Sequence, residues 1–364
     1  MNPARILVLI KGLGVGGAEK LLSEGARYWD RERFEYHVGY ALPWKDQLVD
    51  EIRALGFEVH LLGSKKGLTP RVAGNIRRVV RDRGIDLVHA HSPTMGVIAR
   101  IVSPVPVVYT EHNVAESYRP PTRFFNRATY SRQRAVIAVS DAVAASVSTW
   151  RGPNVRVIPN GVSVSVDPAR TSAARSELGI ADDSSLIVHV GNIRPGKGHE
   201  VLIAAAAILR ERGRRLRWAS IGGEKYEGDL ARVRDRAAAS GVGDDVQFLG
   251  RRADALGFVG AADVYVNPSE VEGLPVSILE AMALERPIVA TAAGGVPSVI
   301  RDGETGVLVE PGDPQALADG VQRLLDDPAL AKRLGAAARV LVEQEHGLEH
   351  MVRAVEAVYE EILG

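Results

Sequence analysis

The stretch from Asp263 to Ile300 constrains the fold most, because it reads as a strand, a helix and a second strand joined by short turns. Residues 263–267 alternate like a buried strand. Pro275 stands where a first helical residue is favoured, and apolar residues at helical spacing follow it. A second strand, 287–292, breaks at a pair of glycines. Such an alternation of strands and helices predicts a parallel sheet with helices on its faces.

Two carboxylates lie in this stretch, Glu272 in the turn and Glu280 inside the predicted helix. Eight helical residues rise about 12 Å, which is the order of the distance from the sugar to the ribose of a nucleotide-sugar. The amides at the start of the helix, near Leu274 and Val276, could hold a diphosphate between them. The alternative is that Glu272 is a solvated loop acid and Glu280 lies on the polar face of an amphipathic helix.

The sequence EGLPVSILEAMA, followed by PIVATAAGGVPSVI, resembles the C-terminal signature of the retaining GT-B glycosyltransferases of family 4. That signature has two glutamates separated by seven residues, then a helix, a short strand and a glycine pair, and Gly294-Gly295 fits the pair. The resemblance runs over nearly the whole chain. It implies an α/β chain of the GT-B class, with two Rossmann-like doubly wound domains facing an interdomain cleft.

The same alternation runs through the rest of the 364 residues, which are enough for two hydrophobic cores. We expect an N-terminal acceptor-binding domain over 1–165 and a C-terminal nucleotide-sugar-binding domain over 166–345. The linker is expected at about 163–183, where Ser, Ala and Asp are dense. A last helix, within 346–364, is expected to cross back to the first domain.

A glycine-rich loop follows the first predicted strand, and its Gly12, Gly14 and Gly17 satisfy the G-x-G-x-x-G pattern of dinucleotide-binding proteins. A dehydrogenase would place an acid at the end of the second strand, but residues 36–42 run into Pro43-Trp44. This mismatch argues against NAD. The resemblance instead directs this loop, through Gly16 and Gly17, toward the donor diphosphate.

Three predicted strands of the first domain end in polar residues that would lie at one edge of the sheet. His91 follows one strand and His112 another, and a turn with the sequence PNGV contains Asn160. Ligands of open α/β sheets bind at the carboxyl ends of strands. By resemblance, His112 matches the active-site histidine of the family, and His91 and Asn160 belong to the cleft or acceptor side. The family usually continues PNGV with Asp, whereas this chain has Ser163.

A second glycine-rich loop, 191–199, carries two cations within three residues, Arg194 and Lys197. Glycines let the backbone approach an anion, so this loop suits a diphosphate leaving group, although a helix-entry turn with solvated cations remains the alternative. Many family members have the arginine directly after the first glycine, where this chain has Asn192. The family places the donor base near the turn at Gly250-Arg251.

The composition limits the chemistry and the location. No cysteine occurs, which excludes disulfides, thiolate metal sites and cysteine nucleophiles. The first apolar run, Ile6 to Ile10, is too short for a signal peptide, so we expect a cytoplasmic protein. Residues 1–165 hold 23 Lys and Arg against 14 Asp and Glu, so this half is basic although the whole chain has no net charge.

The segment RPPTRFFNRATYSRQR, from Arg119 to Arg134, contains five arginines, three aromatic residues and no acid. It could rest on an anionic membrane surface, with the aromatics at the interface. It could equally be an ordinary helix that packs its aromatics inward. A peripheral position on the inner face of the plasma membrane is therefore an open expectation.

Taken together, the residues and the resemblance predict retaining transfer of a sugar from a UDP- or GDP-sugar to a glycan or lipid-linked acceptor, in polysaccharide or glycolipid synthesis. No D-x-D sequence occurs, so we expect no metal ion at the diphosphate. We also expect no cofactor and no nucleic-acid partner. The alternatives are a GT-B sugar-nucleotide epimerase or phosphorylase and a sugar-nucleotide-binding protein without catalysis. The predicted catalytic residues are His112 and Glu272, and the predicted donor-binding residues are Gly16, Gly17, Arg194, Lys197, Gly250, Arg251, Gly273, Leu274, Val276 and Glu280.

Overall fold

The computed structural model describes residues 3–65, 69–163, 168–180 and 184–364. The chain divides into two compact units, one formed by Met1–Gly161 with Leu348–Gly364 and the other by Val162–Gly347. The expected domain boundary at 165 and 166 falls outside the described residues. Among the helices of the described ranges, none is both long and apolar enough to cross a bilayer.

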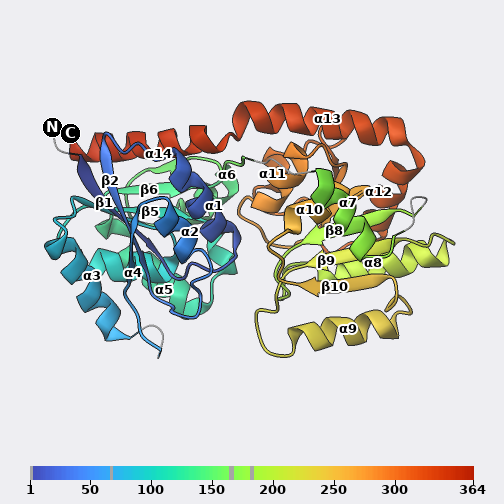
Figure 1. Ribbon diagram of the computed structural model, residues 1–364, viewed down its shortest axis with the longest axis horizontal. Coiled ribbons are helices and arrows are strands. Elements are labelled where there is room, and N and C mark those ends of the chain that lie inside the picture. Colours follow the sequence, from blue (N-terminus) through green and yellow to red (C-terminus); the bar gives the residue numbers. More distant parts are fainter. Residues whose placement is uncertain (1–2, 66–68, 164–167, 181–183) are drawn as a thin grey trace. The chain divides into compact units, whose positions relative to one another are not determined.

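The first unit is built on a seven-stranded sheet in the order β3-β2-β1-β4-β5-β6-β7, and all its strand pairs are parallel (Figure 1). Apolar residues fill both faces of the sheet, as expected for strands covered by helices on both sides. The strands are β1 (Ala4–Ile10), β2 (Phe34–Tyr40), β3 (Glu58–Leu61), β4 (Leu87–Ala90), β5 (Val107–Glu111), β6 (Ala135–Ala138) and β7 (Val155–Val157). The α-helices are α1 (Gly17–Gly25), α2 (Val49–Ala54), α3 (Pro70–Asp82), α4 (Pro93–Val102), α5 (Pro120–Thr129), α6 (Asp141–Val147) and α14 (Leu348–Leu363), with short 3-10 segments η1 (Ala26–Tyr28), η2 (Ala115–Ser117) and η3 (Tyr130–Arg132).

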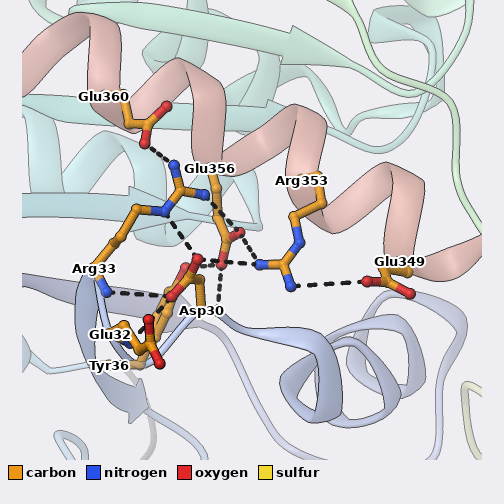
Figure 2. Close-up of polar contacts among 8 residues, drawn as sticks. All are labelled: Asp30, Glu32, Arg33, Tyr36, Glu349, Arg353, Glu356 and Glu360. Atoms are coloured by element: carbon orange, nitrogen blue, oxygen red, sulfur yellow. Dashed lines mark hydrogen bonds and ion pairs between the residues drawn. The ribbon is translucent and has the colours of Figure 1, made fainter.

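The C-terminal helix α14 belongs to this first unit and is fixed to it by a buried carboxylate (Figure 2). Glu356 is almost fully buried and accepts hydrogen bonds from the Tyr36 hydroxyl at 2.7 Å and the Asp30 amide at 2.8 Å. Arg353, on the same helix, donates to its other oxygen at 2.9 Å. Because Tyr36 lies on β2, this network ties the end of the chain to the sheet.

The second unit is built on a six-stranded sheet in the order β10-β9-β8-β11-β12-β13, again with every strand pair parallel. Its large apolar cluster lies between the sheet and helices that include α8 and α12. The strands are β8 (Leu186–Val190), β9 (Arg217–Ile221), β10 (Val246–Gly250), β11 (Val264–Asn267), β12 (Ile288–Thr291) and β13 (Val307–Val309). The helices are α7 (Pro168–Glu177), α8 (His199–Glu211), α9 (Asp229–Ala239), α10 (Ala255–Ala261), α11 (Val276–Ala283), α12 (Pro314–Asp326) and α13 (Pro328–Glu345), with the 3-10 segment η4 (Val296–Ser298).

The local sequence patterns place most elements, with three differences. Residues 168–177, within the expected linker, form helix α7, which packs against α10. Helix α4 was not expected, although Pro93 stands at its first position. Pro275 is the N-cap of α11, with an extended backbone, and the helix begins one residue later.

Candidate active site

Two loops of the second unit meet at the carboxyl edge of its sheet, one after β8 and one after β11, which are neighbouring strands. The Glu270 amide donates to the Gly196 carbonyl at 3.0 Å and joins them. Gly198 lies in the left-handed region, and a Cβ there would lie 1.9 Å from the Pro268 carbonyl oxygen. Only glycine allows this approach of the two backbones.

An ion pair bridges these two loops. The Lys197 ammonium lies 2.5 Å from a carboxylate oxygen of Glu272, and the two side chains are only 17% and 6% exposed. A buried carboxylate needs a partner, and the lysine supplies both charge and hydrogen bond. The solvated loop acid considered for Glu272 is therefore wrong, and the structure brings together two residues that lie 75 positions apart in the sequence.

Helix α11 starts beside this pair. The amides of Ile278 and Leu279 donate to the carbonyl of the N-cap residue Pro275, whereas the amides of Val276 and Ser277 precede the first hydrogen bond of the helix, and the N-terminus carries positive potential. Glu280 is buried with 6% exposure, which contradicts its assignment to a solvated polar face. The Gly295 amide donates to the Gly273 carbonyl at 2.7 Å, and a Cβ on Gly294 would lie 1.8 Å from the Glu272 carbonyl oxygen.

The remaining predicted donor residues of this unit lie on the same edge. Gly250 ends β10, and its carbonyl accepts from the Gly222 amide at 2.8 Å. The Arg251 side chain packs against Gly223, because a Cβ added to Gly223 would lie 2.3 Å from the arginine Nε. Arg194 is partly exposed and donates to the neighbouring Pro195 carbonyl. The Arg194 guanidinium therefore has a weaker contact than the Lys197 ammonium. Leu274, which precedes α11, is buried.

In the first unit, histidines from two neighbouring strands meet at the carboxyl edge. The Nδ1 atom of His91 lies 3.2 Å from Nε2 of His112, and the His91 ring contacts that of His89. Burial lowers the pKa of His112 to about 4 and that of His89 to about 3. Burial and the two neighbouring imidazoles also lower the pKa of His91. These rings are therefore neutral at pH 7.

His91, His112 and Asn160 line one cavity within the first unit, together with apolar residues of α1 and α14. Gly16 is the N-cap of α1 and Gly17 is its first residue. The next residue, Ala18, lines this cavity. The structure thus gathers the predicted residues of each unit at the carboxyl edge of that unit's sheet.

One buried acid, Glu111, was not singled out by the sequence analysis. It accepts hydrogen bonds from Tyr109 at 2.9 Å, from Asn126 at 3.1 Å and from Tyr118. Burial raises the pKa of Glu111 to about 7, although these hydrogen bonds oppose the rise. The available signal was an acid at the last position of an apolar strand, directly before His112.

Two Rossmann-like units of parallel strands define the GT-B class. Anabaena HepE, solved with UDP and glucose, matches this fold with a TM-score of 0.88 over 98% of this chain and 100% of that chain, at 23% identity. Residues 171–341 match the model described as glycosyl transferases group 1, and residues 15–166 match glycosyltransferase family 4.

Curated relatives agree with these matches. An alpha-D-kanosaminyltransferase of Streptomyces kanamyceticus is 32% identical over 82% of this chain and 82% of its own length. A D-inositol 3-phosphate glycosyltransferase of Acidothermus cellulolyticus is 31% identical over 70% of this chain and 63% of its own length. The chain therefore belongs to the group 1 glycosyl transferases and is a GT-B glycosyltransferase.

Proposed function

We propose that this enzyme transfers a sugar, with retention at the anomeric carbon, from a UDP- or GDP-sugar to a glycan or lipid-linked acceptor. The observation that carries the proposal is the buried Lys197–Glu272 ion pair beside the start of α11, with Glu280 buried in the same helix. This arrangement brings the Lys197 cation, the amides at the start of α11 and the acids Glu272 and Glu280 into one region of the second unit.

Each of these groups has a defined part in the proposal. Lys197, Arg194 and the first-turn amides of α11 bind the diphosphate and stabilise the charge that develops on it as the sugar leaves. Glu280 accepts hydrogen bonds from the ribose hydroxyls, and Glu272 accepts from the sugar hydroxyls. Gly250 and Arg251 lie beside the base.

Cations and helix dipoles take the place of a metal ion at the diphosphate in this proposal. The absence of any D-x-D sequence supports metal-independent transfer. His112 acts as a neutral imidazole that hydrogen-bonds the donor sugar, which agrees with its lowered pKa. His91 and Asn160, which line the cavity of the first unit, belong to the acceptor side.

The names of similar proteins support a nucleotide-sugar donor. HepE was solved with UDP and with UDP-glucose, which favours a uridine donor over a guanosine donor for this chain. The curated relatives are named for different groups, one for a kanosaminyl group and another for D-inositol 3-phosphate, so their names do not point to a shared acceptor. We therefore propose a uridine diphosphate sugar as the favoured donor, and only a broad class, a glycan or a lipid-linked molecule, for the acceptor.

A lipid-linked acceptor fits the surface of α5 in the first unit. Phe124 and Phe125 are 66% and 56% exposed and contact one another, so the alternative in which they pack inward is wrong for these two. Tyr130, by contrast, is buried. Exposed aromatics beside Arg123 and Arg127 suit an anionic membrane surface.

The test of the proposed activity measures release of nucleoside diphosphate from UDP- and GDP-sugars in the presence of EDTA, with and without glycan and lipid-linked acceptors. We expect acceptor-dependent release. Conversion of the nucleotide-sugar to its epimer without acceptor would assign an epimerase instead. Binding without turnover of any donor would assign a binding protein.

The membrane surface has its own test, which is flotation with liposomes at low salt. We expect recovery with anionic but not with neutral liposomes, and a clear loss in the double variant Phe124→Ser with Phe125→Ser. Val340, exposed on α13 of the second unit, supplies the matched control as Val340→Ser. Equal recovery on both kinds of liposome would exclude this membrane role.

A further inference from the structure

Four ionisable side chains lie together on one face of the first unit's sheet, away from the residues discussed above. Glu35 and His37 are two positions apart on β2, and Glu58 and His60 are two positions apart on β3. Alternate residues of a strand point to the same face. His37 pairs in register with Glu58, so the two pairs of side chains face one another across neighbouring strands.

Three atoms of this group form a nearly equilateral triangle. His37 Nδ1 lies 3.3 Å from His60 Nε2 and 3.3 Å from Glu58 Oε2, and His60 Nε2 lies 3.4 Å from the same Glu58 oxygen. In a tetrahedral zinc site the ligand bonds measure about 2.0–2.1 Å, which places neighbouring ligand atoms about 3.3–3.4 Å apart. The three edges have this length.

We propose that His37, Glu58 and His60 bind a divalent transition-metal ion of the zinc class. The ligand atoms are His37 Nδ1, His60 Nε2 and Glu58 Oε2, and they come from residue types that suit zinc and its first-row neighbours. Water completes the tetrahedron. His60 and Glu58 are partly open to solvent, with 17% and 49% of their side chains exposed, so an ion can reach the site.

Two neighbouring side chains set the strength of this site. A carboxylate oxygen of Glu35 lies 3.3 Å from Nε2 of His37, the nitrogen that does not face the ion, and ligating histidines commonly have such a carboxylate behind them. Arg83 acts in the opposite direction, because its Nε lies 3.0 Å from the Glu58 oxygen assigned to the ion. Arginine and metal therefore compete for that oxygen.

The position of the site indicates a structural role. In the part of the sheet that the structure describes, β3 is an edge strand and pairs with β2. Glu58 is the first residue of β3, whereas the predicted sugar-transfer residues of this unit follow the carboxyl ends of strands. An ion here would fasten the edge strand to β2. None of the site's residues is among the predicted donor-binding residues, for which metal-independent chemistry is proposed.

The test uses untagged full-length enzyme treated with a chelator and then titrated with Co²⁺ and with Zn²⁺. We expect one equivalent of Co²⁺ to bind with the visible absorption of a tetrahedral site, and Zn²⁺ to displace it and raise the melting temperature. His60→Ala and Glu58→Gln should abolish the absorption, and Glu35→Gln should weaken binding by about 10–100-fold. Arg83→Gln should tighten binding.

His350→Ala is the matched control, because His350 is an exposed histidine outside this cluster. It should bind Co²⁺ as the native enzyme does. Far-ultraviolet circular dichroism of His60→Ala and Glu58→Gln tests whether both variants are folded. The absence of stoichiometric binding would overturn the proposal and leave a hydrogen-bonded pair of imidazoles. Unchanged affinity in either of these two variants would also overturn it.

Discussion

Two buried glutamates, one in each unit, follow or end a strand at the carboxyl edge of a sheet, and they have opposite surroundings. Glu272 of the second unit faces the ammonium of Lys197 at 2.5 Å. Glu111 of the first unit faces two tyrosine hydroxyls and an asparagine amide, and its pKa is raised to about 7. The same side chain is thus held by a cation in one place and by neutral donors in the other.

The contrast extends to the neighbours of each glutamate. Around Glu272, glycines allow the loops to pack closely. The start of α11 carries positive potential, which suits a ligand that develops negative charge. Next to Glu111, the imidazole of His112 is neutral and lines a largely apolar cavity. We therefore propose that the second unit holds an anion and that the first unit presents neutral hydrogen-bonding groups.

The largest effect is expected from breaking the ion pair. Glu272→Ala or Lys197→Ala should lower kcat for transfer by about 10²–10³-fold, because the proposal gives Lys197 the charge on the leaving diphosphate and Glu272 the hydroxyls of the transferred sugar. Each single variant also leaves one buried charge without its partner, so the melting temperature should fall.

The double variant Lys197→Met with Glu272→Gln separates these two effects, because it leaves no unpaired charge. It should regain stability but not activity. Arg339→Ala, which removes an exposed pair with Glu343, is the control and should change neither. Near-normal turnover in either single variant would defeat the assignment.

The second prediction concerns Glu111, which has a higher pKa in the folded than in the unfolded protein. Between about pH 4.5 and 7 the folded state holds the extra proton, so this group makes stability fall as the pH rises. The loss amounts to about 3 kcal/mol by pH 7. Glu111→Gln should remove this fall in the free energy of unfolding with rising pH.

The measurement is urea unfolding of the native enzyme and of Glu111→Gln at pH 5, 6, 7 and 8. The buried histidines contribute the opposite slope, because their lowered pKa values make stability fall as the pH drops below about 6.5. Both proteins contain those histidines, so the difference between the two curves isolates Glu111. A difference that stays constant with pH would mean that Glu111 is not protonated on folding.

The third prediction tests the close contact of the loops in the second unit. Gly196 and Gly198 both have a left-handed backbone, but a Cβ meets nothing at 196 and collides with the Pro268 carbonyl at 198. Gly196→Ala should therefore cost about 1 kcal/mol, and Gly198→Ala clearly more. Gly198→Ala should also lower transfer, because the loop positions Lys197. Equal losses of stability and activity in both variants would show that the loops can separate freely.

The smallest effect is expected at another buried glutamate, Glu356, which has both a cationic and neutral hydrogen-bond partners. Tyr36→Phe removes one neutral donor but leaves the amide of Asp30 and the guanidinium of Arg353 (Figure 2). We expect a loss of about 1–2 kcal/mol in unfolding free energy. Glu361→Gln, which breaks an exposed pair with Arg156, should have little effect. An unchanged stability in Tyr36→Phe would show that α14 is not held through this carboxylate.

The sequence predicted the second unit better than the first, for a physical reason. Most of the predicted donor-binding residues of the second unit lie in two short segments, the loop 191–199 and the strand–helix unit 263–300, where the turn and helix patterns are local. Their spacing therefore carries the signal. That Lys197 would meet Glu272 was not predictable from spacing, because this contact depends on the order of β8 and β11 in the sheet.

The features that sequence reasoning missed depend on long-range packing. The burial network of Glu111 depends on Tyr118 and Asn126, which lie outside its strand. The His37–His60 cluster depends on the pairing of β2 with β3. Helix α7 was hidden by a composition typical of a linker, and it is stabilised by its contact with α10. Tertiary contacts decide such cases, and local propensity does not.

The most direct test of the central claim is thermal unfolding with UDP, GDP, NAD and a panel of UDP- and GDP-sugars, with EDTA present. A ligand at 100 times its dissociation constant adds about 2.7 kcal/mol of stability. The account predicts stabilisation by one nucleoside diphosphate series in EDTA, with the shift lost in Lys197→Ala. Stabilisation by NAD alone would contradict it and return the donor site to the glycine loop at Gly12.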